Sequence, residues 1–191
     1  KVRHRVLVGA DHDDTDYFAR LGFDFFPIGF IDYGRRGPRP TFGALPELTA
    51  EQDDRFRTTA VYAQDQIAIG ERLDVTAGLR WSQLDLDQRS NGVKKTYDEW
   101  TPRLGVTFQA RPGVALFAGY SEGFRGVLNF LGLKPPVPET SLSWEAGVKL
   151  AKPVRGLSAT FAAFEITRQN VPTPDPANPF FQIQTGEQRS R

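Results

Sequence analysis

Apolar and polar residues alternate with a spacing of two along several segments of this chain, and turns of very unequal length separate those segments. The clearest segment covers residues 73–81, where polar residues such as Asp74 and Arg80 occupy the positions between the apolar ones. This alternation is typical of a β-strand with one apolar face and one polar face. The apolar face of the segment carries Leu73, Val75, Ala77, Leu79 and Trp81.

The pattern predicts eight strands whose connections alternate between long and short. Short turns at one end and long loops at the other are typical of an antiparallel β-barrel that spans an outer membrane, with the long loops outside. The predicted strands are residues 5–11, 57–69, 73–85, 100–109, 114–121, 141–150, 157–168 and, as the start of an eighth, 180–185. The predicted long loops are residues 12–55, 88–99, 122–139 and 169–179.

The composition narrows the classes of protein that fit this pattern. Lys and Arg total 24 and Asp and Glu total 23, so the net charge of +1 gives no electrostatic reason to expect a nucleic-acid partner. The absence of cysteine excludes disulfides and thiol chemistry within the chain. A mean hydropathy of -0.42 argues against a helical membrane protein but is compatible with a barrel, whose strands need only about 10 residues, half of them apolar.

Four aromatic residues support the same orientation. Trp81 and Tyr120 lie on apolar faces where their strands approach long loops, and Trp100 and Trp144 lie where strands leave long loops. All four therefore gather at the predicted extracellular end, as Trp and Tyr do in the interfacial girdles of membrane barrels. Aromatic residues are common on the strands of any β-protein, so their shared end, and not their type, favours a girdle.

Alternation alone does not separate a membrane barrel from a soluble β-sandwich whose apolar stripes pack against a second sheet. Predicted strands of about 10 residues exceed the usual 5–6, which favours the barrel. The polar faces carry Arg80, Arg103, Glu145 and Lys149, which suit a water-filled interior and bulk solvent equally. The predicted fold class is all-β: an antiparallel transmembrane β-barrel, present here as a partial barrel of about eight meandering strands in an open, curved sheet.

An ordered series of short motifs runs along most of the chain. Each motif is weak alone, whereas the ordered series is specific. The motifs are VYAQDQI (61–67), LDVTAGLR (73–80), TPRLG (101–105), YSEGF (120–124), PETS (138–141), WEAGVK (144–149), FEITRQNV (164–171) and TGEQRSR (185–191). Together they resemble the barrel of a TonB-dependent outer-membrane receptor, most closely the ferric-siderophore class.

This resemblance implies a barrel of about 22 strands with a plugged lumen. Residues 1–191 would form a middle-to-late part of that barrel domain, without its N-terminal plug and its last strands; the lack of any methionine agrees with a fragment. The implied function is TonB-coupled import of a ferric siderophore across the bacterial outer membrane by a monomeric barrel in contact with lipid. TonB would bind the missing N-terminal region, and iron would arrive inside the siderophore, so no cofactor and no catalysis are expected.

Aromatic and arginine residues in the long loops are the best candidates for ligand contact. Aromatic side chains give rigid contact area, and Arg pairs with the anionic oxygens that many siderophores carry. Long loops also need internal packing, so the same aromatics could equally pack against one another. The candidates are Phe25, Phe26, Phe30, Tyr33, Arg35 and Arg36, with Phe124, Arg125 and Phe130 in a later loop.

The chain gives weaker support to several other kinds of chemistry. Residues 119–123 match the G-x-S-x-G nucleophile motif, but the only histidines, His4 and His12, lie far upstream, so a hydrolase is the least supported function. Residues 11–16 are rich in carboxylates but lack the glycine of an EF-hand loop, which favours a solvated strand end over a Ca²⁺ site. His4 and His12 share a strand face about 26 Å apart and cannot share a metal. Besides the receptor, the pattern also fits a passive porin-like channel or a soluble β-sandwich binding module.

Overall fold

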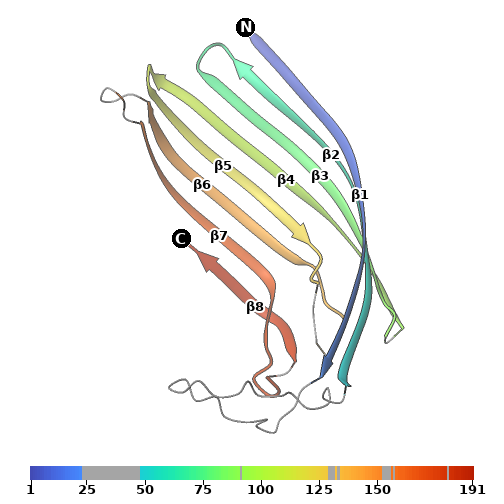
Figure 1. Cartoon of the computed structure of the whole chain (residues 1–191). Coiled ribbons are helices and arrows are strands. Elements are labelled where there is room, and N and C mark those ends of the chain that lie inside the picture. Colours follow the sequence, from blue (N-terminus) through green and yellow to red (C-terminus); the bar gives the residue numbers. More distant parts are fainter. Residues whose placement is uncertain are drawn as a thin grey trace, which may run out of the picture.

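The chain forms one antiparallel sheet of eight strands, in which each strand is hydrogen-bonded to the next one in sequence. Figure 1 shows the sheet as open and curved, with β1 and β8 at its two edges. The computed structural model describes residues 1–22, 48–90, 92–128, 132, 134–151, 156, 158–179 and 181–191. The strands are β1 (Val2–Gly22), β2 (Leu48–Ile69), β3 (Leu73–Gln88), β4 (Val93–Arg111), β5 (Val114–Arg125), β6 (Glu139–Ala151), β7 (Ser158–Pro174) and β8 (Gln182–Ser190).

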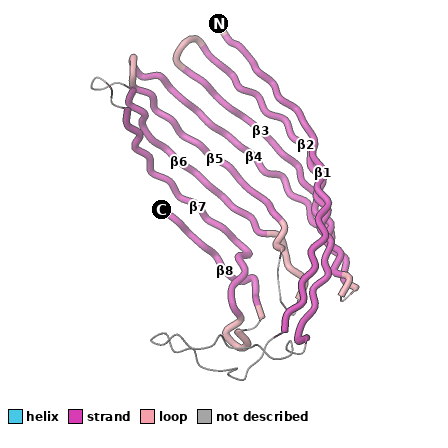
Figure 2. Tube along the Cα trace, viewed as in Figure 1, coloured by secondary structure: helices cyan, strands magenta, loops and turns pink. Residues whose placement is uncertain are grey.

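The described residues form a single layer. All eight strands belong to the same sheet, and the described part of the chain contains no second sheet that could cover either face (Figure 2). The predicted partial antiparallel barrel is therefore confirmed, and a two-layer sandwich is excluded for these residues. Across the described residues, no helix is long and apolar enough to span a membrane.

The sequence predicts tight turns at residues 70–72, 111–113 and 152–156, and the first two are confirmed at their glycines. Gly70 and Gly113 adopt φ angles of 65° and 79°, in the left-handed region that favours glycine. A Cβ at Gly113 would also lie 2.6 Å from the Ala151 carbonyl oxygen. These turns join β2 to β3 and β4 to β5 and fix the register of both hairpins. The third predicted turn, residues 152–156, lies mostly outside the described residues.

The two faces of the sheet are named here from β3. The outer face is the one that carries Leu73, Leu79 and Trp81, and the inner face is the one that carries Asp74 and Arg80. The strand register assigns the remaining positions to one face or the other, because side chains alternate along each strand and directly paired residues share a face.

The strands extend much further at the loop end than the sequence predicts. The expected loop over residues 12–55 is wrong over much of its length, because β1 continues to Gly22 and β2 already begins at Leu48. The expected loops 88–99 and 169–179 are also wrong, since most of their residues belong to β4 and β7. Polar side chains pair across these strands and allow the ladder to continue: Thr96 donates to Asp85 at 2.7 Å, and Lys94 pairs with Asp87 at 2.9 Å.

The polarity of the two faces exchanges in these extensions. Beyond Trp81, the outer face of β3 carries Asp85 and Asp87, while Leu84 and Leu86 point to the inner face. Leu84, Leu86 and Phe56 form a buried cluster, and the side chains of Tyr17, Tyr97 and Phe124 pack against it. The small hydrophobic core of the described chain therefore lies on the inner face at the loop end.

Candidate functional site

The outer face presents a band of exposed apolar side chains, interrupted by the hydrogen-bonded pair His4–Asp65 and by Glu165. Val8 is 70% exposed and Phe161 is 63% exposed, on β1 and β7 respectively. From Leu73 to Trp81 the band runs about 26 Å along β3, which at the usual strand tilt of barrels corresponds to much of the apolar thickness of a bilayer. Besides Trp100 and Trp144, its exposed members include Val2, Val6, Val8, Val61, Ile69, Leu79, Leu104, Val106, Phe108, Leu116, Leu142 and Phe161.

The four predicted girdle aromatics lie at the loop-side end of this band. Trp81 is paired directly with Trp100, and Tyr120 with Trp144, so each pair stands side by side on the outer face. Tyr120 also pairs with Leu104, four residues along β4 from Trp100. Because the strands of a barrel are tilted, side chains at the same level along the barrel axis are offset along neighbouring strands, as Trp100 and Tyr120 are here. The structure thus brings the four together as two pairs, and their contact with a membrane interface stays a prediction.

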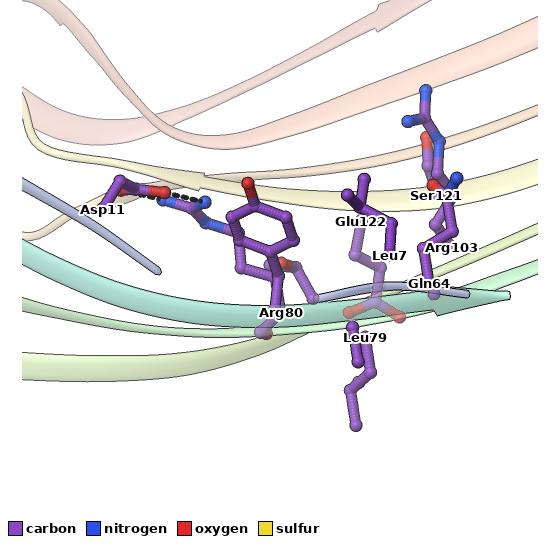
Figure 3. A pocket seen from close by; sticks show the side chains of 12 residues that line it. Leu7, Asp11, Gln64, Leu79, Arg80, Arg103, Ser121 and Glu122 are labelled. Atoms are coloured by element: carbon purple, nitrogen blue, oxygen red, sulfur yellow. Dashed lines mark hydrogen bonds and ion pairs between the residues drawn. The ribbon is translucent and has the colours of Figure 1, made fainter. Parts of the chain in front are cut away.

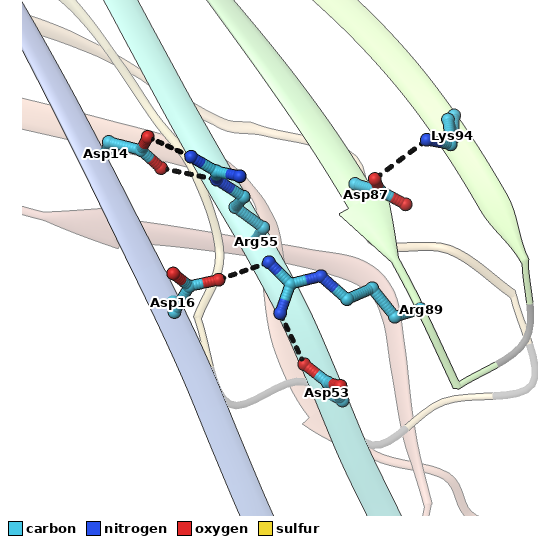
Figure 4. A network of polar contacts seen from close by, with 7 residues as sticks. All are labelled: Asp14, Asp16, Asp53, Arg55, Asp87, Arg89 and Lys94. Atoms are coloured by element: carbon cyan, nitrogen blue, oxygen red, sulfur yellow. Dashed lines mark hydrogen bonds and ion pairs between the residues drawn. The ribbon is translucent and has the colours of Figure 1, made fainter.

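At the loop end of β1 to β4, charged residues replace the apolar band beyond these aromatics (Figure 4). Arg55 on β2 binds both carboxylate oxygens of Asp14 on β1, and its Nε lies 2.7 Å from Oδ1. Arg89 joins Asp16 to Asp53, with 3.0 Å between Nη1 and the Asp53 oxygen. The hydrogen bonds from Arg55 lower the pKa of the Asp14 carboxyl below its ordinary value. The outer face of the extensions is accordingly hydrophilic.

A cavity of about 490 Å³ lies mainly on the inner face, where residues of all five strands from β1 to β5 line it. Figure 3 shows Arg80 reaching over this face to Asp11, while Leu79 points to the opposite side of the sheet. The two guanidinium nitrogens of Arg80 lie 2.7 and 2.9 Å from the Asp11 carboxylate oxygens, and Nε donates to Ser82. This pair is half-exposed, so it contributes little stability and mainly fixes the position of both charges. The result is a polar, water-accessible wall.

A second charged cluster lies near the loop end of β5, β6 and β7. Glu139 is only 4% exposed and accepts hydrogen bonds from Arg125, at 2.9 Å, and from Arg168. Burial alone would raise the pKa of Glu139, but the bonds from Arg168 and Arg125 outweigh it and hold the pKa below its ordinary value. Two guanidinium groups around one carboxylate leave this cluster with net positive charge.

Most predicted ligand-contact residues lie outside the described part of the chain: Phe25, Phe26, Phe30, Tyr33, Arg35, Arg36 and Phe130. Of the two that are described, Phe124 packs against the inner-face cluster, and Arg125 pairs with Glu139. Sequence reasoning missed both the apolar cluster and Glu139. The first had a visible signal, because period-two alternation continues after Trp81 with Ser82, Leu84 and Leu86 on the face that had been polar.

The weaker motifs occupy ordinary strand positions. Ser121 lies within β5, paired with Arg103 and Ser143, and not on a strand-to-helix turn. The carboxylates of residues 11–16 are divided between the two faces of β1, and no three His, Cys, Asp or Glu side chains within the described ranges form a possible metal site. His4 and His12 share the outer face as predicted and bind Asp65 and Thr59, respectively.

Comparison with known proteins agrees with this arrangement. The family described as TonB dependent receptor-like, beta-barrel, matches residues 2–191. The chain belongs to the TonB-dependent receptor family. The metal-pseudopaline receptor of Pseudomonas aeruginosa is 36% identical over all of this chain, which spans 28% of that receptor. The ferrichrome outer membrane transporter/phage receptor of Escherichia coli is 32% identical, again over the whole chain and 27% of the transporter.

Solved structures support the fold assignment. The ferric preacinetobactin receptor of Acinetobacter baumannii superposes with a TM-score of 0.66 and 22% identity, covering 98% of this chain and 30% of that receptor. The ferripyoverdine receptor of Pseudomonas aeruginosa gives a TM-score of 0.65 at 19% identity, covering 97% of this chain and 26% of the receptor. The described sheet is thus part of a TonB-dependent receptor barrel, which is located in the bacterial outer membrane.

Proposed function

We propose that the whole receptor binds a ferric siderophore at the cell surface and imports it by TonB-coupled active transport, and that this chain forms part of its barrel wall. The observation that carries the proposal is the single-layer sheet with an exposed apolar band on one face and a polar wall on the other. Only a bilayer outside and water inside satisfy both faces at once. Relatives named as metal-pseudopaline and ferrichrome receptors support the same class of cargo.

The charge at the loop end supports an anionic chelate as ligand. Arg125 is highly exposed and shares the Glu139 carboxylate with Arg168, so the cluster keeps a net positive charge that attracts anions. We infer that Arg125 and Phe124 contact the ligand together with Phe25, Phe26, Phe30, Tyr33, Arg35, Arg36 and Phe130. Iron would enter already coordinated, as cargo, so the protein supplies no metal ligand and no catalytic group.

The remaining proposed partners follow from the same arrangement. Lipid covers the apolar outer face, with Trp81, Trp100, Tyr120 and Trp144 at the outer membrane interface. The TonB complex binds a region of the receptor other than this chain, and the barrel is monomeric. The charged outer face beyond the aromatic pairs lies outside the hydrocarbon layer, where the ion pairs of Arg55 and Arg89 are solvated.

Uptake measurements test this function against a passive channel. The full-length receptor is produced in a bacterium that lacks ferric-siderophore receptors of its own, with or without TonB. Uptake of radioactive iron is measured from hydroxamate, catecholate and citrate chelates. Import of one class that stops when TonB is deleted agrees with the proposal. Equal import of all three classes without TonB would identify a porin-like channel, and no import of any class would contradict a siderophore receptor.

A further inference from the structure

A pocket that none of the sequence motifs indicates lies at the loop end, between residues 134–137 and the beginning of β8. Its volume is about 350 Å³, and its surface is mostly apolar. The apolar part of the lining comes from Pro135, Val137, Phe181 and Ile183. It is distinct from the polar cavity around Arg80, because the two share no lining residue.

Side-chain hydrogen bonds hold the first wall of this pocket in place. The Gln184 amide binds both backbone polar groups of Val137, accepting from its N–H at 2.7 Å and donating to its carbonyl at 2.7 Å. The same amide donates to the Asn170 carbonyl at 2.9 Å. The Tyr97 hydroxyl donates to the Pro136 carbonyl at 3.1 Å. The segment is therefore tied to β4 and β8 directly, and to β7 through the Gln184 amide.

The second wall is a tight turn after β7 whose polar groups also bond among themselves. The Asp175 N–H donates to the Phe181 carbonyl at 2.9 Å, and the Phe181 N–H donates to the Asn178 carbonyl at 2.9 Å. The Ile183 carbonyl accepts from the Thr173 hydroxyl at 3.3 Å. These bonds satisfy several backbone polar groups of the wall, and the surface that lines the pocket is mostly apolar.

We propose that this pocket binds an aromatic ring or a short acyl chain of a small molecule. This inference rests on the proposed function, in which the bound group is the apolar part of the imported chelate. A dry apolar cavity of about 150 Å³ is enough to hold benzene, so a ring with its substituents fits here. Lys134 and Asp175 both line the pocket, so its rim carries one positive and one negative side chain, and the apolar lining is what favours a ring or an acyl chain.

Fluorine NMR of the full-length receptor in detergent tests the pocket directly. The probe is 4-fluorobenzyl alcohol, and 2-fluoroethanol serves as the probe without a ring. Ile183→Trp fills the pocket, whereas Ile69→Trp makes the same change at an exposed outer-face position on β2. We expect the ring probe to broaden with the wild type and with Ile69→Trp and to lose that broadening with Ile183→Trp. The probe without a ring should not distinguish the three proteins.

Equal broadening of the ring probe by all three proteins would overturn the proposal. This result would be obtained whether the pocket does not bind a ring or another segment of the receptor fills it. Thr185→Phe narrows the same pocket from β8 and replaces Ile183→Trp if that variant does not fold. The outcome is separable from the uptake test, because a receptor that imports no iron can still bind the ring probe. Conversely, TonB-dependent import without ring binding would contradict only the pocket.

Discussion

Two glycines on the inner face illustrate how closely neighbouring strands approach at single positions. A Cβ added to Gly147 on β6 would lie 2.3 Å from the Phe161 carbonyl oxygen and 2.7 Å from the Phe117 ring. A Cβ at Gly105 on β4 would meet only the Thr76 Cβ, at 3.8 Å. The first position therefore requires glycine because of its surroundings, whereas the second has room for a side chain.

We expect Gly147→Ala to reduce the free energy of unfolding of the full-length receptor by about 1–3 kcal/mol, the usual cost of forcing extra atoms into a packed site. Gly105→Ala is the matched control and should change it far less. Urea unfolding in lipid vesicles, followed by the gel migration of the heat-modifiable folded form, measures both. Equal losses in the two variants would show that the close approach at Gly147 is not present.

Glu139 makes a prediction about acid stability. Its pKa lies below the ordinary value of 4.5 because the hydrogen bonds from Arg168 and Arg125 outweigh burial. A carboxyl with a depressed pKa in the folded state contributes stability above its unfolded pKa and loses that contribution as the pH falls through the folded value. The wild-type receptor should therefore lose stability below about pH 4.5 partly through this residue.

Glu139→Gln removes the ionised carboxylate and should cost about 1.5–3 kcal/mol at neutral pH, the range for hydrogen bonds to charged groups. The variant should also show a smaller drop in stability between neutral and acidic pH than the wild type. Guanidinium midpoints measured at a series of pH values give both quantities. A parallel pH dependence for the two proteins would mean that Glu139 does not titrate as described.

At the scale of a strand, β3 shows what alternation predicts and where it misleads. The apolar run from Leu73 to Trp81 predicted its face, and the turn at Gly70 predicted its pairing with β2. The predicted strand ended at Asp85, whereas β3 continues to Gln88 and contains both Asp85 and Asp87. They are strand residues whose side chains bind Thr96 and Lys94 on β4. Cross-strand partners of this kind become visible only when the register is known.

The candidate site was predictable to a lesser degree than the fold. The outer-face positions of Trp81 and Trp100 follow from local alternation, which a single sequence displays. The role of Glu139 depends on Arg125 and Arg168, which come from two other strands, so no local pattern marks it. The same reason explains why the apolar pocket was missed, since its walls come from separate connections between strands.

The exchange of faces along β3 predicts a sharp dependence of charge tolerance on position. Val75 and Gln83 both lie on the outer face, but Val75 is within the apolar band, paired with Ile67 and Val106, and Gln83 is just beyond Trp81. Val75→Arg should cost about 2–4 kcal/mol of folding free energy in lipid, whereas Gln83→Arg should cost at most about 1 kcal/mol. Folding titrations of both variants into lipid vesicles measure the difference. Similar costs at the two positions would place the membrane boundary elsewhere.

At the scale of the whole molecule, the described chain is one curved layer whose two faces need different solvents. Its small core of Phe56, Leu84 and Leu86 lies at the loop end and leaves most of the outer apolar surface uncovered. The edges at β1 and β8 carry unpaired backbone groups, which in lipid require neighbouring strands. The sheet is therefore stable as part of a complete barrel in a bilayer, where lipid and the remaining strands cover these surfaces.

Spin-label accessibility along β3 tests this assignment of the two faces most directly. Single cysteines are introduced at residues 77–80 of the full-length receptor in lipid vesicles, labelled, and exposed to oxygen, which concentrates in lipid, and to a water-soluble nickel complex. We predict that oxygen relaxes the labels at residues 77 and 79, and that nickel relaxes the labels at residues 78 and 80. Nickel access at 77 and 79 with oxygen access at 78 and 80, or no alternation at all, would contradict the account.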